Sequence, residues 1–282
     1  MPTVAQSIHQ WRAAFAAAGV DSPRLTIELL LAHVTGLDRG ALIGMGNHEL
    51  TPAQSAQLQA LCARRAAREP LAYLLGHWDF YGRRFAVKPG VLIPRPETEA
   101  VIDLARKLLP PGAQGWAADA GCGSGALAVT LALEFPHLRV VATDLHPTPL
   151  QVTAENARAL GVSSRLALVR MDALTGLKPA ALFDLMVSNP PYVTPQDYPT
   201  LQPEVRDFEP QEALVGGQSG LIIPETIVHQ AAARLKPGGW LILEHGMEQG
   251  AALRQAATSA GYKDIRTEKD FAGLDRILVA QA

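Results

Sequence analysis

An Asn-Pro-Pro-Tyr sequence at residues 189–192 combines side chains that could hold an amino group. It directly follows the apolar stretch 183–188, which predicts a strand. Two successive prolines fix the backbone and remove two N–H donors, so carbonyl oxygens stay free to accept hydrogen bonds. Asn189 Oδ1 and the Pro190 carbonyl can together hold both hydrogens of a planar –NH2 group, with the Tyr192 ring against its plane. The alternative is that the sequence is only a rigid turn.

A glycine-rich loop, Asp119 to Gly125 (DAGCGSG), follows another predicted strand at 116–119 and precedes a predicted helix. Glycines permit a tight turn and let a ligand approach the backbone closely. Open α/β sheets bind ligands at the carboxyl ends of their strands. With Ala126 the loop also fits G-x-G-x-x-A, so the glycines alone leave a dinucleotide site open. A carboxylate at Asp119 would repel a pyrophosphate but suits an ammonium group, which favours S-adenosylmethionine over NAD.

Acidic residues after the next two predicted strands extend this cofactor site. Asp144 is placed to accept both hydroxyls of a ribose; the alternative is a helix N-cap before His146. Asp172 could accept from the adenine amino group, with capping or a surface role as the alternative. Cys122 is interpreted as a small residue that fills space in the loop. The expected cofactor contacts are Asp119, Gly121, Cys122, Gly123, Ser124, Gly125, Asp144, Asp172, Ala173 and Asn189.

The two loops together predict transfer of a methyl group to a nitrogen. An amide or exocyclic amine nitrogen is a poor nucleophile because its lone pair is delocalised. Binding both N–H bonds would direct the lone pair at the sulfonium methyl, so that positioning and electrostatics drive transfer without an obligatory strong base. We therefore assign catalysis to Asn189, Pro190 and Tyr192, and substrate binding to Asn189, Pro190, Pro191 and Tyr192.

The elements that must position these loops change in character along the chain. Residues 1–76 are rich in Ala and Leu at helical spacing and predict a small helical bundle. Residues 77–95 are aromatic and β-branched around Gly82 and predict a hairpin linker. Residues 96–282 begin with a helix near Pro96 and then alternate strands with helices. This alternation predicts an α/β domain with a mostly parallel, doubly wound sheet.

Composition excludes several classes of protein. The chain has 282 residues, 48% hydrophobic and 18% charged, and no apolar run long enough for a membrane span, so we expect a folded cytoplasmic protein. Two cysteines are too few for a disulfide framework, and no spacing suggests a metal site. A net charge of −2 argues against coating nucleic acid. Residues 1–95 carry ten basic and six acidic side chains, which raises the hypothesis of an anionic partner for that part.

The chain resembles the protein-(glutamine-N5) methyltransferases, and among them the release-factor glutamine methyltransferases of the HemK/PrmC type. Beside the two loops, the segments that carry the resemblance are LAYLLGHWDFYGRRFAVKPGVLIPRPETE (71–99), DAGCGSGALA (119–128), VSNPPYV (187–193), FEPQEALVGGQSGL (208–221) and LEHG (243–246). They occur in the family's order across most of residues 71–282. One departure is Ala173, where several relatives place an aromatic residue, so adenine stacking there is in doubt and Leu174 or another apolar residue would substitute.

The resemblance implies methylation of the glutamine in the Gly-Gly-Gln motif of class-1 peptide-chain release factors, in translation termination. It implies a seven-stranded Rossmann-like domain behind a helical domain that docks the factor, and we expect a monomer with no sequence-specific nucleic acid and no membrane. The alternatives are a glutamine methyltransferase of a ribosomal protein, an adenine-N6 or cytosine-N4 DNA methyltransferase, an inactive cofactor-binding regulator and a dehydrogenase. Glu97, Glu99 and the Phe208-Glu209-Pro210 turn stay open between functional and structural roles, and His245 is interpreted as a packing residue.

Overall fold

The computed structural model describes residues 1–282, the side chain of Ile43 excepted. Contacts divide the chain into two compact units. The helical unit contains residues 1–77 and 202–208, and the catalytic unit contains residues 78–201 and 209–282. Residues 78–95, which the sequence suggests as part of a linker, thus belong to the catalytic unit. The short segment 202–208 belongs to the helical unit although both of its neighbours in the chain lie in the catalytic unit.

The helical unit is a bundle whose helices begin where the sequence supplies caps. Thr3 and Thr51 each cap a helix through a capping box, with Gln6 and Gln54 as the reciprocal partners. The core contains Ile27, Leu30 and Leu31, all of them fully buried, with Val34 partly buried against it. The helices are α1 (Val4–Ala17), α2 (Pro23–Thr35), α3 (Arg39–Gly44), α4 (Pro52–Ala66), α5 (Leu71–Leu75) and the short α9 (Pro203–Arg206).

A buried ion-pair cluster holds segment 202–208 within the helical unit. Glu204 accepts hydrogen bonds from Arg65 Nη2 at 2.9 Å and from Arg68 Nε at 2.7 Å. Arg68 also donates to the carbonyl oxygens of Ala18 and Gly19 at 3.1 and 2.7 Å. The Arg65 and Glu204 side chains are only 7% and 12% exposed, so losing Glu204 would leave the buried Arg65 charge without its ion-pair partner.

The catalytic unit contains a small two-stranded sheet and a seven-stranded sheet with the order β5-β4-β3-β6-β7-β9-β8. Strands β3 to β7 run parallel, and β9 pairs antiparallel with both β7 and β8. The strands are β1 (His77–Phe80), β2 (Arg83–Ala86), β3 (Gly115–Ala120), β4 (Leu138–Asp144), β5 (Leu166–Arg170), β6 (Phe183–Ser188), β7 (Leu235–Glu244), β8 (Lys263–Lys269) and β9 (Asp275–Gln281). The predicted fold class is confirmed, and the strands predicted at 116–119 and 183–188 are β3 and β6.

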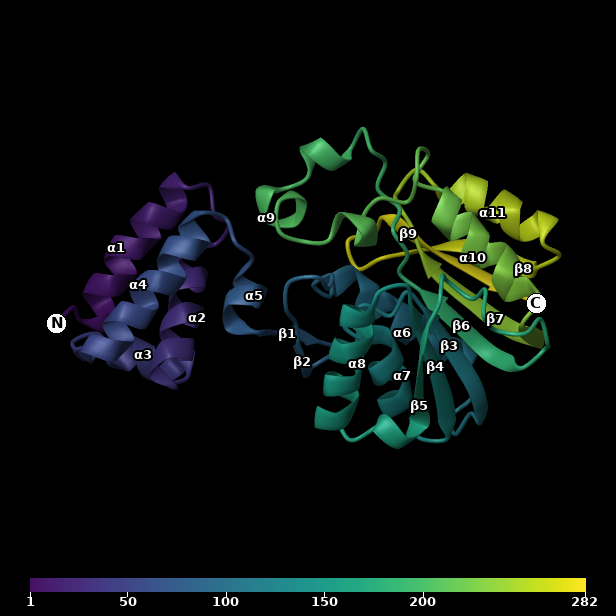
Figure 1. Ribbon diagram of the computed structural model, residues 1–282, viewed down its shortest axis with the longest axis horizontal. Coiled ribbons are helices and arrows are strands. Elements are labelled where there is room, and N and C mark those ends of the chain that lie inside the picture. The colour runs from purple at the N-terminus through teal and green to yellow at the C-terminus, as the bar shows by residue number, and fades with distance from the viewer. The chain divides into compact units, whose positions relative to one another are not determined.

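Helices cover both faces of the large sheet (Figure 1). Ala117 of β3 packs with α6, α7 and α8, whereas its neighbour Ala118 packs with α10 and α11, because successive residues of a strand face opposite ways. The α-helices are α6 (Glu99–Leu108), α7 (Ala126–Glu134), α8 (Pro147–Ala159), α10 (Ile222–Ala232) and α11 (Gly250–Ser259); the 3-10 turns are η1 (Pro96–Thr98), η2 (Ser163–Arg165), η3 (Tyr198–Thr200) and η4 (Gln211–Ala213).

The strand order reverses between β3 and β6, which are neighbours in the sheet but not in the chain. Such a switch point opens a crevice at the carboxyl ends of the strands, where α/β proteins bind ligands. The glycine loop follows β3 and the Asn-Pro-Pro-Tyr loop follows β6, so the fold brings both predicted loops to this crevice. None of the helices among the described residues has the length and apolarity that crossing a bilayer requires.

Candidate active site

Backbone hydrogen bonds hold the glycine loop against the end of β4. The N–H groups of Gly121 and Cys122 both donate to the Thr143 carbonyl, at 2.9 and 2.8 Å. Gly121, Gly123 and Gly125 have φ values of 79°, 56° and 80°, which L side chains rarely adopt. A Cβ at Gly125 would lie 2.7 Å from Thr153 Cγ2, whereas at Gly121 and Gly123 it would meet nothing within 4 Å. The first two glycines therefore leave room for a ligand beside the backbone.

Asp119 lies at the bottom of this crevice with one oxygen unused. Its Oδ2 accepts the Ala128 N–H at 3.0 Å, while the buried Oδ1 has no hydrogen-bond partner among the described residues. Burial, and then the nearby charge of Asp144, raise the pKa of Asp119 to about 7, against which the Ala128 hydrogen bond acts. A buried carboxylate oxygen without a partner is unfavourable, and a donor or cationic group beside Oδ1 would compensate it.

Asp144 ends β4, and both of its carboxylate oxygens bind the backbone. Oδ2 accepts the Gly123 N–H at 3.1 Å, and Oδ1 accepts the His146 N–H at 3.0 Å. Burial raises the pKa of Asp144 and outweighs these hydrogen bonds. Helix α8 has His146 at its N-cap position, so Asp144 orders the loop before the helix and does not itself cap it. Each oxygen keeps a lone pair for a hydroxyl group.

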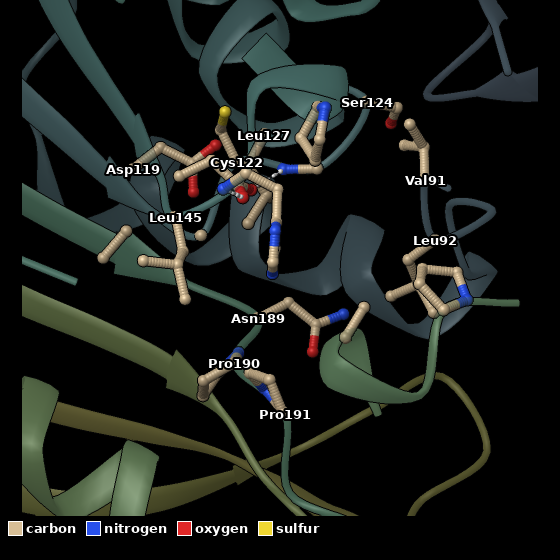
Figure 2. A pocket seen from close by; sticks show the side chains of 18 of the residues that line it. Val91, Leu92, Asp119, Cys122, Ser124, Leu127, Leu145, Asn189, Pro190 and Pro191 are labelled. Carbon is tan, nitrogen blue, oxygen red and sulfur yellow. Dashed lines mark hydrogen bonds between the residues drawn. The ribbon is translucent and has the colours of Figure 1, made fainter. Parts of the chain in front are cut away.

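A single cavity is lined by both predicted loops (Figure 2). In this view the Asp119 and Cys122 side chains lie on one side, and Asn189, Pro190 and Pro191 lie on the other. Asp172 and Ala173 also line the cavity, and Ala173 has a left-handed backbone with φ 45°. All ten residues predicted to contact the cofactor are near it, and nine line it: Asp119, Gly121, Cys122, Gly123, Ser124, Asp144, Asp172, Ala173 and Asn189, with Gly125 in the adjoining turn.

Leu174, one of the apolar residues suggested to substitute for an aromatic at position 173, lies away from the cavity. It is fully buried in the core. Leu145, directly after Asp144, lines the cavity and is 51% exposed. Leu145 is one of the apolar residues that line the cavity, and its position directly after an assigned acid was the signal in the sequence that could have indicated it.

The Asn-Pro-Pro-Tyr loop presents acceptors to the cavity. Asn189 Nδ2 donates to Thr98 Oγ1 at 3.0 Å, whereas Asn189 Oδ1 and the Pro190 carbonyl accept no hydrogen bond within the described part of the chain. Tyr192 does not line the cavity; its hydroxyl donates to Glu244 Oε1 at 3.2 Å. The structure thus brings Asn189, Pro190 and Pro191 together at the cavity and places the Tyr192 hydroxyl in a buried network behind it.

The loop is supported from behind by the glycine-containing segment 208–221. Val193 donates to the Leu214 carbonyl at 2.8 Å, and Gly216 returns a hydrogen bond to the Val193 carbonyl at 3.0 Å. A Cβ at Gly216 would overlap the Pro191 carbonyl, so only glycine allows this approach. Gln249 Nε2 donates to the Tyr192 carbonyl at 2.9 Å. Sequence reasoning missed Gln249, which has no motif of its own.

In the Phe208-Glu209-Pro210 turn, Glu209 has a structural role. The buried Glu209 carboxylate accepts from Arg95 Nη2 at 2.6 Å and from the Ile93 N–H at 3.0 Å. Glu209 thereby fixes residues 93–95, and Arg95 lines the cavity. His245 is fully buried, with Nδ1 against the Gly246 carbonyl at 2.7 Å, and burial lowers its pKa.

The doubly wound sheet, the glycine loop after β3 and the acceptor loop after β6 define the class of the protein as a methyltransferase. Family models agree: residues 6–76 match the PrmC N-terminal domain and residues 99–202 match the methyltransferase small domain. In fold, the chain is similar to a methyltransferase from Pyrococcus furiosus (TM-score 0.54, 18% identity, 82% of this chain and 98% of that one). It is also similar to the hMettl16 catalytic domain (TM-score 0.57, 15% identity, 81% and 80%).

Sequence relatives define the family. Release factor glutamine methyltransferases from Nitratidesulfovibrio vulgaris and Moorella thermoacetica are 42% and 41% identical, covering 94% and 99% of this chain and 90% and 98% of their own lengths. The Escherichia coli enzyme of that name is 38% identical over 93% of both chains. The chain belongs to the release factor glutamine methyltransferase family. The predicted resemblance and the predicted methyltransferase activity are confirmed.

Proposed function

We propose that this enzyme transfers a methyl group from S-adenosylmethionine to the side-chain nitrogen of the glutamine in the Gly-Gly-Gln motif of class-1 release factors. The observation that carries the proposal is the pair of unoccupied acceptors, Asn189 Oδ1 and the Pro190 carbonyl, at the cavity that also contains the glycine loop. A primary amide has two N–H donors, which matches two acceptors. The relatives named after this activity supply the identity of the substrate.

The residues of the cavity fit S-adenosylmethionine. The unpartnered Asp119 Oδ1 suits its ammonium group, and the open space beside Gly121 and Gly123 suits its approach to the backbone. Asp144 would accept the ribose hydroxyls, and Leu145 would contact the adenine, with Asp172 and Ala173 at its edge. Cys122, Ser124 and Gly125 would contribute through the shape of the loop. Burial raises the pKa of the Cys122 thiol well above the usual range, so this side chain stays neutral.

The chain acts mainly by positioning the acceptor nitrogen. When bound, S-adenosylmethionine supplies an electrophilic methyl group. Asn189 Oδ1 and the Pro190 carbonyl accept the two N–H bonds of the glutamine amide, which fixes the rotation of the amide and orients its nitrogen toward the methyl group. As the nitrogen gains positive charge in the transition state, its hydrogens become stronger donors and these two bonds strengthen. One proton passes from the methylated nitrogen to solvent water, which restores a neutral amide.

Mass spectrometry of a reconstituted reaction tests the proposed function. We expect a gain of one methyl group on the Gly-Gly-Gln glutamine after a class-1 release factor is incubated with the enzyme and S-adenosylmethionine. We further propose that the helical unit docks the release factor and that the enzyme acts in the cytoplasm, where release factors work, as a monomer. An unmodified release factor together with a methylated ribosomal protein would instead identify the latter as substrate.

The raised pKa of Asp119 predicts that cofactor affinity depends on pH. In the free protein the Asp119 pKa is about 7, and a bound ammonium group favours the ionised form, so binding below pH 7 requires the loss of a proton. Lowering the pH from 7.5 to 6 reduces the ionised fraction and should weaken binding by about eightfold. Isothermal titration calorimetry across this range measures the effect. Asp119→Asn, which cannot titrate, should bind more weakly and lose this dependence; an equal slope in both proteins would contradict the assignment.

A further inference from the structure

One continuous chain of hydrogen bonds runs behind the acceptor loop. Asn189 Nδ2 donates to Thr98 Oγ1 at 3.0 Å, Thr98 Oγ1 donates to Glu244 Oε2 at 2.6 Å, and Tyr192 Oη donates to Glu244 Oε1 at 3.2 Å. These residues come from three separate segments: the η1 turn, the loop after β6 and the end of β7. Thr98 and Glu244 are only 4% and 2% exposed, so water does not compete for these bonds.

The chemistry of these groups fixes the direction of every hydrogen bond. Burial raises the pKa of Glu244, and the hydrogen bonds from Thr98 and Tyr192 act against that rise. Both Glu244 oxygens accept, so the Thr98 hydroxyl uses its single proton toward Glu244 and offers a lone pair to Asn189. The Asn189 group that faces Thr98 must therefore be the donor, Nδ2. If the amide were rotated by half a turn, Oδ1 would face the lone pairs of Thr98 and a buried donor would be lost.

Glu244 also holds the other end of the loop. Its second oxygen accepts the Tyr192 hydroxyl, and burial raises the pKa of Tyr192, so the phenol keeps the proton that it donates. One buried carboxylate thus acts on the first and the last residue of the Asn-Pro-Pro-Tyr sequence. In the part of the chain that the structure describes, Asn189 Oδ1 is the atom of this side chain left without a partner (Figure 2 shows the side chain at the cavity).

We propose that Thr98 and Glu244 are positioning residues that hold the Asn189 amide in the orientation that presents Oδ1 to the substrate. This rests on the proposed function, in which Oδ1 accepts an N–H bond of the glutamine amide. Neither residue needs to touch the reacting atoms. Their effect is to prevent the population of a rotated amide whose Nδ2 would face the substrate's own donors and repel them.

The matched pair Thr98→Val and Thr98→Ser tests the role of the hydroxyl group. Valine keeps the shape of threonine and removes the acceptor for Asn189 Nδ2, whereas serine keeps the hydroxyl. We expect Thr98→Val to lower kcat by about tenfold to a hundredfold with KM for the release factor changed little, as for other residues that orient a ligand-binding side chain. Thr98→Ser should keep kcat within about threefold of the wild-type value. Calorimetry should show unchanged binding of S-adenosylmethionine in both.

A second readout does not require turnover. In protein labelled with ¹⁵N-asparagine, the Asn189 side-chain amide is assigned by its absence in Asn189→Ala. We expect one of its proton signals to move upfield and to exchange faster in Thr98→Val and in Glu244→Gln, but not in Thr98→Ser. Glutamine at position 244 can donate to Thr98, which allows the hydrogen-bond direction to reverse. If Thr98→Val does not fold, the Asn189 amide signal is compared in Glu244→Gln and Thr98→Ser. A change in Glu244→Gln alone supports the positioning role, and no change in Glu244→Gln contradicts it.

The outcomes separate the inference from the function on which it rests. Normal kcat in Thr98→Val, an equally large loss in Thr98→Ser, or an unchanged Asn189 amide signal in Thr98→Val would each overturn the positioning role. A wild-type enzyme that does not methylate the release factor would overturn the proposed function, and the NMR comparison would still decide whether Thr98 and Glu244 orient Asn189.

Discussion

Asn189→Ala is expected to reduce kcat for methyl transfer by about 10²–10³-fold, the usual cost of losing one preorganised polar contact to the transition state. The variant removes Oδ1, one of the two acceptors that we propose for the glutamine amide, and leaves the glycine loop and Asp144 in place. Cofactor affinity should therefore change little. Single-turnover methylation of the release factor and calorimetric titration of S-adenosylmethionine measure the two quantities separately.

Asn47→Ala provides the control for this experiment. Asn47 lies exposed in a turn of the helical unit, so the same substitution there should leave both quantities at the wild-type level. A normal rate in Asn189→Ala would rule out the pair of acceptors as the glutamine site. A loss of rate that accompanies an equal loss of cofactor affinity would instead assign Asn189 to the cofactor.

Gly216→Ala should lower kcat by about a hundredfold, although residue 216 does not line the cavity, because a displacement of about 1 Å in a reacting group has effects of this size. The added Cβ would overlap the Pro191 carbonyl and would lie 2.7 Å from the Gly220 carbonyl. Both are backbone atoms that no side-chain rotation can move away, so the Asn-Pro-Pro-Tyr loop must shift. Steady-state kinetics with the release factor would show the effect in kcat.

Gly44→Ala is the matched substitution. Neither glycine has a left-handed backbone, and a Cβ at position 44 would meet nothing within 4 Å. It should leave kcat unchanged, so that the loss at position 216 reports the contact with the loop and not a general effect of replacing glycine. Equal kinetics in the two variants would show that the segment 208–221 does not support the acceptor loop.

The sequence predicts best the parts of the site that are continuous in the chain. The glycine loop and Asn189 to Tyr192 each follow a strand with a clear apolar pattern, so their place at the carboxyl edge of the sheet follows from the alternation of strands and helices. The same alternation predicts that Asp119 and Asp144, which lie at the ends of their strands, face the cavity. The departure at Ala173 was visible too, but side-chain direction could not be predicted: Leu174 is buried in the core, whereas Leu145 lines the cavity.

Contacts between distant segments could not be predicted in the same way. Thr98 and Asn189 are 91 residues apart, and Thr98 and Glu244 are 146 apart. Each lies in a segment that carries the family resemblance, yet no periodicity connects a hydroxyl in one turn with a carboxylate at the end of a distant strand. The role of Tyr192 shows the same limit: its sequence neighbours suggested a stacking face, while the fold directs its hydroxyl to Glu244.

The Glu204 cluster has a consequence for how far the helical unit can be treated as a module. Segment 202–208 interrupts the catalytic unit in the chain, yet its carboxylate is buried against Arg65 and Arg68. A chain that began at residue 78 would keep Glu204 and lose both arginine side chains that neutralise it. The polypeptide thus passes between the two units three times, and replacing the first 77 residues would also remove the ion-pair partners of the segment 202–208.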